Sequence, residues 1–508
     1  MLQNLDIPVG LAFHRQPRTA MERRPYRLVQ LSLQVVCLLA FCCLIAGARA
    51  EAGSYGVTGD IQRRIDAASA AGGGTVTLEA GDYPVAGIFL KSGVTLELRK
   101  GATLLASTNK ADYANVTGGP NTPRAAHAVV CANGATNIAL VGEGTVDGRG
   151  WAIAGTERDN EPGRWRDVMF YRSKGVRVEG VTLRNAASWT CYFKECEDVV
   201  ARRVTIRSLT NWNNDGIDID AKNVLVEDCD IDSDDDAICP KSDNPRFICE
   251  NVEVRNCRLA SNCNHIKLGT ASKGGFRNIW IHDCTLVQCA TNIIPQIKNK
   301  KGRGNDIPGW DKRDIASRVG IAAECVDGGI LENVRVSGIR MTRCCQTPIL
   351  VRLGRRREHP DGRASFLRNV VIENVTGESA SLLASSITGV PGLRPSGVTI
   401  RNVDLKLMGG GPASEVTRPV PEAEKAYPEN RMFKRQLLPA YGFYVRHADG
   451  VTFENVKLTY TGDTEARPAI FIDDSTDVRT EGCSFRPPAG SYPAVYATGR
   501  KLPLSSPR

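Results

Sequence analysis

A short segment that recurs about once every 27 residues constrains the fold of this chain more than any other feature. Asn-Val-Leu-Val-Glu-Asp-Cys begins at Asn223, Asn-Val-Glu-Val-Arg-Asn-Cys at Asn251 and Asn-Ile-Trp-Ile-His-Asp-Cys at Asn278, so the copies are 28 and 27 residues apart. Each copy alternates apolar and polar residues, as a strand does when one of its faces enters a core. Because spacings this short leave no room for crossover helices, the strands are expected to stack in coils. The repeat therefore predicts an all-β fold, a single-stranded right-handed parallel β-helix.

Looser copies extend this pattern along most of the chain. They begin at Val176, Val204, Asn333, Asn369, Asn402 and Asn455. A β-sandwich is the alternative fold, but antiparallel strands do not require the same Asn and Cys at one position of each repeat. A solenoid stacks like residues on like, so Val224, Val252 and Ile279 are expected to form one row of the core.

The two ends and the interruptions of the repeat can also be predicted. Residues 60–71 have apolar side chains at Ile61, Ile65 and Ala68 and are followed by three glycines, which is typical of a short helix that caps the first coil. Two stretches break the rhythm, residues 298–318 and the Pro-rich residues 410–439. Both are expected to be loop excursions from a rigid scaffold, where binding sites often form.

The first 50 residues have the features of an export signal. Arginines precede an apolar stretch from Leu28 to Ala48, which ends in Ala48-Arg49-Ala50. We therefore expect a signal peptide over residues 1–50, cleavage near Ala50, and a secreted catalytic domain over residues 51–508 that no longer contacts the membrane. Met1 and Met21 both remain possible start sites.

The charge of the chain favours no nucleic-acid partner. Of the net charge of +9, the predicted leader carries four, and the other Lys and Arg residues are dispersed among Asp and Glu. Nucleic-acid-binding proteins usually concentrate basic residues in a stripe with aromatic platforms. An acidic polysaccharide fits this mildly basic chain at least as well, and the oligomeric state stays open.

The cysteines are expected to be core residues rather than metal ligands. The chain has 17 of them, but none form the Cys-x-x-Cys pairs typical of zinc and redox sites. Cys229, Cys257 and Cys284 recur at one position of successive repeats, which favours buried, stacked thiols over disulfides.

The densest group of carboxyl residues lies between positions 211 and 242. Asp215 is followed 20 and 21 residues later by Asp235 and Asp236, which is close to one coil, so the three carboxyls are expected on neighbouring coils of one surface. Glycoside hydrolysis needs one carboxylic acid to protonate the leaving oxygen and one carboxylate to activate water. The alternatives are a solvated acidic face or a calcium site.

Several motifs resemble the polygalacturonase family, glycoside hydrolase family 28. They are Asn213-Asn-Asp215-Gly, Asp235-Asp236, Ser188-Trp-Thr and Gly142-Glu-Gly-Thr-Val-Asp-Gly. The resemblance implies a β-helix that hydrolyses galacturonic-acid linkages of pectin with inversion and without a metal or cofactor. It also implies that Asp235 is the general acid and that Asp215 and Asp236 hold the water.

The remaining family motifs match less well. Asn264-His265-Ile266 stands where the family has Gly-His-Gly, so the resemblance implies a catalytic role for His265. Gln296-Ile-Lys298 stands where the family has Arg-Ile-Lys, which makes Lys298 a candidate to bind the substrate carboxylate, with Lys267 as a competitor. Asn213 is the third candidate for substrate binding.

These departures leave other functions open. Rhamnogalacturonan or xylogalacturonan could replace galacturonan as the substrate. A β-helical lyase would use calcium and a basic residue instead of paired acids. A carbohydrate-binding β-helix without catalytic activity would need no acids at all.

Overall fold

Most of the described secondary structure consists of strands, and a 15-residue helix precedes them. The computed structural model describes residues 56–119, 126–153, 163–290, 317–429, 432–433 and 436–498. The predicted signal peptide and Lys298 lie outside these residues. Among the described helices, none is both long and apolar enough to cross a lipid bilayer.

The strands pair in three parallel ladders, here called ladders 1, 2 and 3. Ladder 1 contains β1 (Gly74–Leu78), β4 (Val94–Leu98), β7 (Thr136–Gly142), β10 (Lys174–Glu179), β12 (Cys191–Arg202), β14 (Ile217–Glu227), β17 (Cys249–Arg255), β20 (Gly275–Val287), β22 (Ile330–Leu353), β23 (Phe366–Ser379), β25 (Ser396–Leu407), β27 (Asp449–Tyr460) and β29 (Thr476–Glu481).

Ladder 2 contains β2 (Gly81–Val85), β5 (Ala102–Ala106), β8 (Thr145–Asp147), β11 (Thr182–Arg184), β13 (Thr205–Ser208), β15 (Asp230–Ser233), β18 (Arg258–Ser261), parts of β20, β22, β23, β25 and β27, and β30 (Ser484–Phe485). The long strands bend from one ladder into the next.

Ladder 3 contains β3 (Ile88–Phe89), β6 (His127–Asn133), β9 (Trp165–Tyr171), the first parts of β12 and β14, β16 (Ile238–Pro240), β19 (Asn264–Leu268), β21 (Ser317–Cys325), the end of β22, β24 (Ser385–Thr388), β26 (Phe443–Arg446), β28 (Ile470–Asp473) and β31 (Val495–Ala497). Two short 3-10 helices, η1 (Lys110–Asp112) and η2 (Gly150–Ile153), lie between strands.

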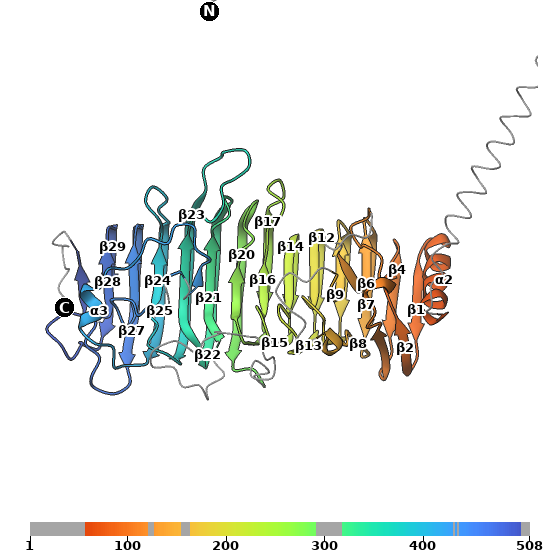
Figure 1. Cartoon of the computed structure of the whole chain (residues 1–508), viewed down its shortest axis with the longest axis horizontal. Helices are drawn as coiled ribbons and strands as arrows, with labels where there is room; N and C mark the ends of the chain where they lie inside the picture. Colours follow the sequence, from red (N-terminus) through yellow and green to blue (C-terminus); the bar gives the residue numbers. More distant parts are fainter. Residues whose placement is uncertain are drawn as a thin grey trace, which may run out of the picture. The chain divides into compact units, whose positions relative to one another are not determined.

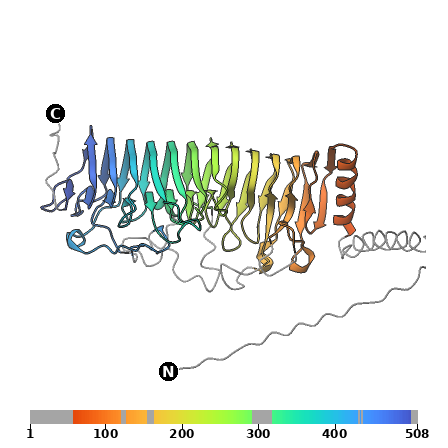
Figure 2. The same ribbon diagram turned by 90° about the horizontal axis from the view of Figure 1, so that it is seen from above.

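The predicted parallel β-helix is confirmed. Coils follow one another from β1 to β31 (Figure 1), and Figure 2 shows the connecting segments gathered along one side of the strands. Val224 pairs in parallel register with Val252, and Val252 pairs with Ile279, so the predicted row of the core exists. This parallel register excludes the β-sandwich alternative.

The capping helix is confirmed as well. Helix α2 (Gly56–Ala70) stands at the β1 end of the coils (Figure 1), and its Ile61 and Ile65 are buried in the main core. These side chains cover the apolar end of the first coil, which would otherwise be open to water.

The backbone conformation explains why Asn recurs at one position of each repeat. Asn223, Asn251 and Asn278 each adopt a left-handed conformation with φ between 54° and 56°, which Asn tolerates better than most residues. Their side chains also form a ladder, because Asn251 Nδ2 donates to Asn223 Oδ1 (3.0 Å) and Asn278 Nδ2 donates to Asn251 Oδ1 (3.1 Å). The repeat therefore specifies both the bend and its cross-coil hydrogen bonds.

The recurring cysteines are core residues, as predicted. Cys229, Cys257 and Cys284 are buried in the main core, and all the cysteines in the described residues are free thiols. They fill the interior as small apolar side chains.

Candidate active site

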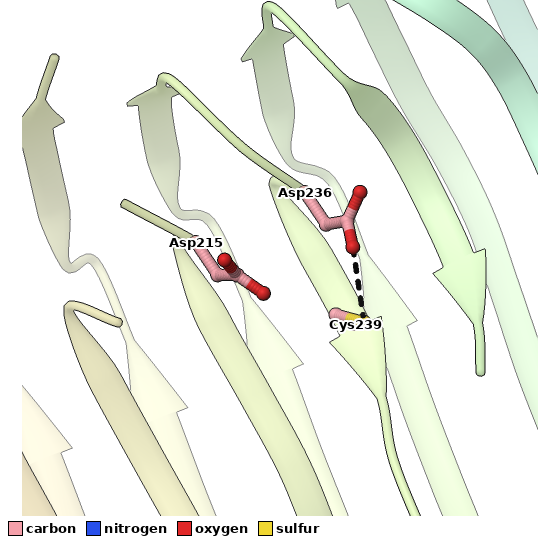
Figure 3. Close-up of side chains that lie close together, drawn as sticks. All are labelled: Asp215, Asp236 and Cys239. Carbon is pink, nitrogen blue, oxygen red and sulfur yellow. Dashed lines mark hydrogen bonds between the residues drawn. The ribbon is translucent and has the colours of Figure 1, made fainter. Parts of the chain in front are cut away.

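The acidic side chains gather where the strands of ladder 3 begin. Asp215 precedes β14, and Asp235 and Asp236 precede β16 on the next coil. The backbone N–H of Gly216 donates to the carbonyl oxygen of Asp236 (2.8 Å), which holds these two positions side by side. Figure 3 shows the carboxyl groups of Asp215 and Asp236 on neighbouring coils, and one oxygen of each lies within 4.8 Å of the other. The structure thus brings the predicted acids together.

All three acids are nearly closed off from solvent. The exposed fraction is 2% for Asp215, 3% for Asp236 and 7% for Asp235. Asp235 Oδ1 accepts a hydrogen bond from the backbone N–H of Asp236 (3.1 Å). Asn213 Nδ2 donates a longer hydrogen bond to Asp235 Oδ2 (3.5 Å). Arg164 in turn donates to Asn213 Oδ1 (2.9 Å), so the Asn213 amide is fixed beside the least buried acid.

One buried lysine compensates the charge around Asp215. Lys241 Nζ contacts Asp215 Oδ2 and Asp218 Oδ1, each at 3.1 Å, and it lies 4.7 Å from the centre of the Trp189 ring. Burial raises the pKa of Asp215 well above its usual value, while Lys241 opposes that rise. Burial alone would lower the pKa of Lys241, but Asp218 and the other acids raise it well above its usual value, so this lysine stays charged.

A second lysine compensates the charge around Asp236. Lys267 Nζ lies 3.3 Å from Asp236 Oδ2 and 3.0 Å from Glu429 Oε1. Asn264 Nδ2 donates to the other oxygen of Asp236 at 2.5 Å. Burial raises the pKa of Asp236, and the ammonium of Lys267 opposes that rise. Asp236 therefore lies between an ammonium and an amide, which hold both of its oxygens in place.

Within the part of the chain that the structure describes, the cluster holds more carboxyl groups than cations. Among the described residues, the ammonium and guanidinium groups that pair with its acids belong to Lys241, Lys267 and Arg318. The acids are Asp215, Asp218, Asp235, Asp236, Glu324 and Glu429. Burial raises the pKa of Asp218 to about 6 and that of Glu324 to about 8, so the cluster retains protons near neutral pH. A site of this kind can both donate and accept a proton.

Lys241 lies against one group of side chains that could otherwise bind a metal ion. The ligand atoms of Asp215, Asp236 and Cys239 lie within 4.8 Å of one another, and the Cys239 thiol donates to Asp236 (Figure 3). However, Lys241 Nζ contacts both Asp215 Oδ2 (3.1 Å) and Cys239 Sγ (3.2 Å). An ammonium there repels a divalent cation, so the donor set does not fit one.

The structure places His265 away from the three predicted acids. Its ring nitrogens contact the carbonyl oxygen of Val287 (2.9 Å) and Ser317 Oγ (3.0 Å), and its side chain is fully buried. Asn264, one residue earlier, is the side chain that donates to Asp236 (2.5 Å). Both ring nitrogens of His265 therefore serve as cross-coil hydrogen-bond partners, whereas its expected catalytic role stays a prediction.

Three residues that contact the acids or their partners were not predicted from the sequence: Asn264, Lys241 and Glu429. Asn264 follows Asp236 by 28 residues and Lys241 follows Asp215 by 26, so the coil spacing could have indicated both. No sequence pattern indicates Glu429, because it lies in the 410–439 excursion and contacts Lys267 across 162 residues.

A parallel β-helix with closely spaced carboxyls at the start of its ladder 3 strands fits a glycoside hydrolase, and the comparisons with known proteins agree with that class. Residues 85–309 match the model of Glycosyl hydrolases family 28, which confirms the predicted resemblance to this family over that region. The chain is a glycoside hydrolase, and it resembles the polygalacturonases over the matched region.

Individual relatives are distant. An endo-polygalacturonase of Pectobacterium carotovorum is 22% identical over 380 residues, which is 70% of this chain and 85% of that protein. A probable exopolygalacturonase B of Neosartorya fischeri is 24% identical over 296 residues, 55% of this chain and 61% of that protein. The family 28 exopolygalacturonase of Yersinia enterocolitica has the same fold, with a TM-score of 0.59 at 17% identity, and the match covers 84% of this chain and 75% of that one.

Proposed function

We propose that this chain is a secreted, inverting glycoside hydrolase that cleaves galacturonic-acid linkages in pectic polysaccharide. The observation that carries the proposal is the group of three nearly buried carboxyls on adjacent coils, Asp215, Asp235 and Asp236. The relatives named as polygalacturonases support the choice of substrate.

The contacts suggest how the three acids divide the reaction. Asp215 and Asp236 each contact a lysine ammonium, which favours the ionised form needed to take a proton from water. Their pKa values are nevertheless raised by burial, which brings them closer to the working pH of a general base. Asp235, the least buried acid, is the proposed general acid.

In the proposed reaction, Asp235 gives its proton to the glycosidic oxygen as the bond from that oxygen to the anomeric carbon breaks. A water held by Asp215 and Asp236 attacks the opposite face and gives up a proton to one of them. The new sugar end carries the inverted configuration, and the leaving chain carries a hydroxyl group. The time-resolved anomeric signal of the first product, measured by NMR, is expected to show inversion.

The decisive experiment replaces each acid by its amide. Asp215→Asn, Asp235→Asn and Asp236→Asn keep the side-chain shape but remove the titrating group, so kcat is expected to fall by about 10² to 10⁴-fold. Asp230→Asn is the control, because Asp230 lies on ladder 2 and pairs with Arg207 (2.5 Å) and Arg258 (2.9 Å). Three folded variants with near-native turnover would refute the assignment.

The substrate needs its own test. Lys267, expected to bind a substrate carboxylate, is already paired with Asp236 and Glu429, which leaves rhamnogalacturonan and xylogalacturonan as the alternative substrates. Galacturonan, rhamnogalacturonan and xylogalacturonan should each be incubated with the protein and the products sized over time. Faster cleavage of galacturonan is the expected result, and ultraviolet absorbance from an unsaturated product would instead indicate a lyase.

A further inference from the structure

The long excursion between β25 and β26 packs onto the outer surface of ladder 3. It includes the short helix α3 (Ser414–Thr417) and the predicted loop 410–439. Its Val416, Met432, Phe433 and Leu438 form an apolar cluster with Tyr444 and Phe471, which project from β26 and β28. Arg352 and Arg446 of ladder 3 donate to carbonyl oxygens of Ala423 (3.3 Å) and Val420 (2.9 Å). The excursion is therefore a packed part of the domain.

The excursion brings one carboxylate into the acid cluster. Glu429 is 1% exposed, and its Oε1 accepts hydrogen bonds from Asn264 Nδ2 and Lys267 Nζ, each at 3.0 Å. Its Oε2 accepts from Arg318 Nη1 at 2.6 Å. Asn264 and Lys267 are the two groups that also contact the oxygens of Asp236. Glu429 thus touches two of the groups that contact a proposed catalytic acid.

We propose that Glu429 is a positioning residue, which holds Asn264 and Lys267 against Asp236 and thereby makes the excursion part of the catalytic apparatus. This inference rests on the proposed role of Asp236 in holding the attacking water. A carboxylate is suited to the task because it accepts hydrogen bonds from an amide, an ammonium and a guanidinium at once. Without Glu429, the buried Lys267 and Arg318 would each lose a carboxylate partner.

The electrostatic effect of Glu429 on Asp236 has a definite sign. Glu429 raises the pKa of Asp236 by direct repulsion, and it also shares the ammonium that would otherwise serve Asp236 alone. Removing the negative charge must therefore lower the pKa of Asp236. The other ionisable groups that face these two carboxyls are Asp215, Asp218, Asp235, Cys239, Lys241, Cys263, Lys267, Arg318, Glu324 and Tyr427.

The test compares the full chain with Glu429→Gln. The titration of the Asp236 carboxyl carbon is followed by NMR in protein labelled at aspartate, and its signal is assigned by its loss in Asp236→Asn. We expect Glu429→Gln to lower the midpoint by about 1 pH unit. The acid limb of kcat against pH is expected to move in the same direction, because Asp236 would ionise at a lower pH. Loss of a merely structural contact would reduce activity without moving that limb.

Two further variants make the result specific. Glu415→Gln removes another buried carboxylate of the same excursion, one that pairs with Arg418 (2.7 Å), and should leave both midpoints unchanged. Glu429→Asp keeps the charge and should restore the wild-type midpoint. An unchanged Asp236 titration, or an unchanged acid limb of kcat, in Glu429→Gln would overturn the inference. The titration needs no substrate, so its result does not depend on the proposed function. The proposed function is refuted separately, if Asp235→Asn retains near-native activity.

Discussion

Replacing Lys241 by methionine should destabilise the protein in a strongly pH-dependent way. In the wild type, its ammonium lies 3.1 Å from both Asp215 Oδ2 and Asp218 Oδ1, and all three side chains are buried. Methionine fills a similar volume without charge, so two buried carboxylates lose their shared counter-charge. Removing one partner of a buried ion pair costs about 3 to 5 kcal/mol, and this is the loss of unfolding free energy expected at pH 7.

The sign of the pH dependence follows from the pKa of these acids. The pKa of Asp218 is already raised to about 6 by burial, and without Lys241 the pKa values of Asp215 and Asp218 in the folded protein rise further. A raised folded-state pKa favours the fold below the unfolded value of about 4 and costs stability as pH climbs through the folded value. Lys241→Met should therefore cost least near pH 4 and most above pH 7.

Urea unfolding of both proteins from pH 4 to pH 8 measures this difference. The control is Lys457→Met, because the Lys457–Asp404 pair (2.9 Å) has side chains that are 56% and 50% exposed. Such a surface pair contributes less than about 1 kcal/mol. If Lys241→Met lost the same free energy at every pH, or no more than Lys457→Met, the buried ion pair would not be compensating these acids.

Two other outcomes follow from the site. Dialysis against a chelator should leave kcat unchanged, since Lys241 and Lys267 supply the positive charge within the cluster; activity that is lost and then restored by calcium would contradict this. His265→Ala should lower the free energy of unfolding by about 1 to 3 kcal/mol, because the buried carbonyl of Val287 and the hydroxyl of Ser317 each lose a hydrogen bond to the imidazole, while kcat measured at matched stability changes little; a 10²-fold loss of kcat would instead support its expected catalytic role.

The fold could be predicted because each coil repeats the same short sequence pattern. Asn251 adopts the left-handed bend and Val252 enters the core, and the same pair of roles recurs at Asn278 and Ile279. The excursion predicted at 410–439 falls between the end of β25 at Leu407 and the start of β26 at Phe443. The other predicted excursion, 298–318, lies almost wholly outside the described residues.

The site could be predicted only in part. The three aspartates stand in short local motifs, so spacing was enough to bring them together. The sequence motif pointed to His265, whereas the side chain that contacts Asp236 is that of Asn264, one position earlier on β19. Neighbouring residues of a strand point to opposite faces, so a difference of one position changes the contacts that a side chain makes. Lys267 was expected to bind substrate, whereas the structure pairs it with Asp236 and Glu429. Coil periodicity carries no information on Glu429, whose contacts cross 111 to 165 residues.

The distance along the chain between Glu429 and its partners also sets an order of events during synthesis. Successive coils contact mainly their neighbours, so stacking can advance as the chain emerges. The counter-charge for Arg318 and Lys267 arrives only when residue 429 has been made and the excursion has docked. A nascent chain that stops before this point would carry the three aspartates in stacked coils with an incomplete set of partners. Competence for hydrolysis should therefore appear abruptly and late, after most of the scaffold has already formed.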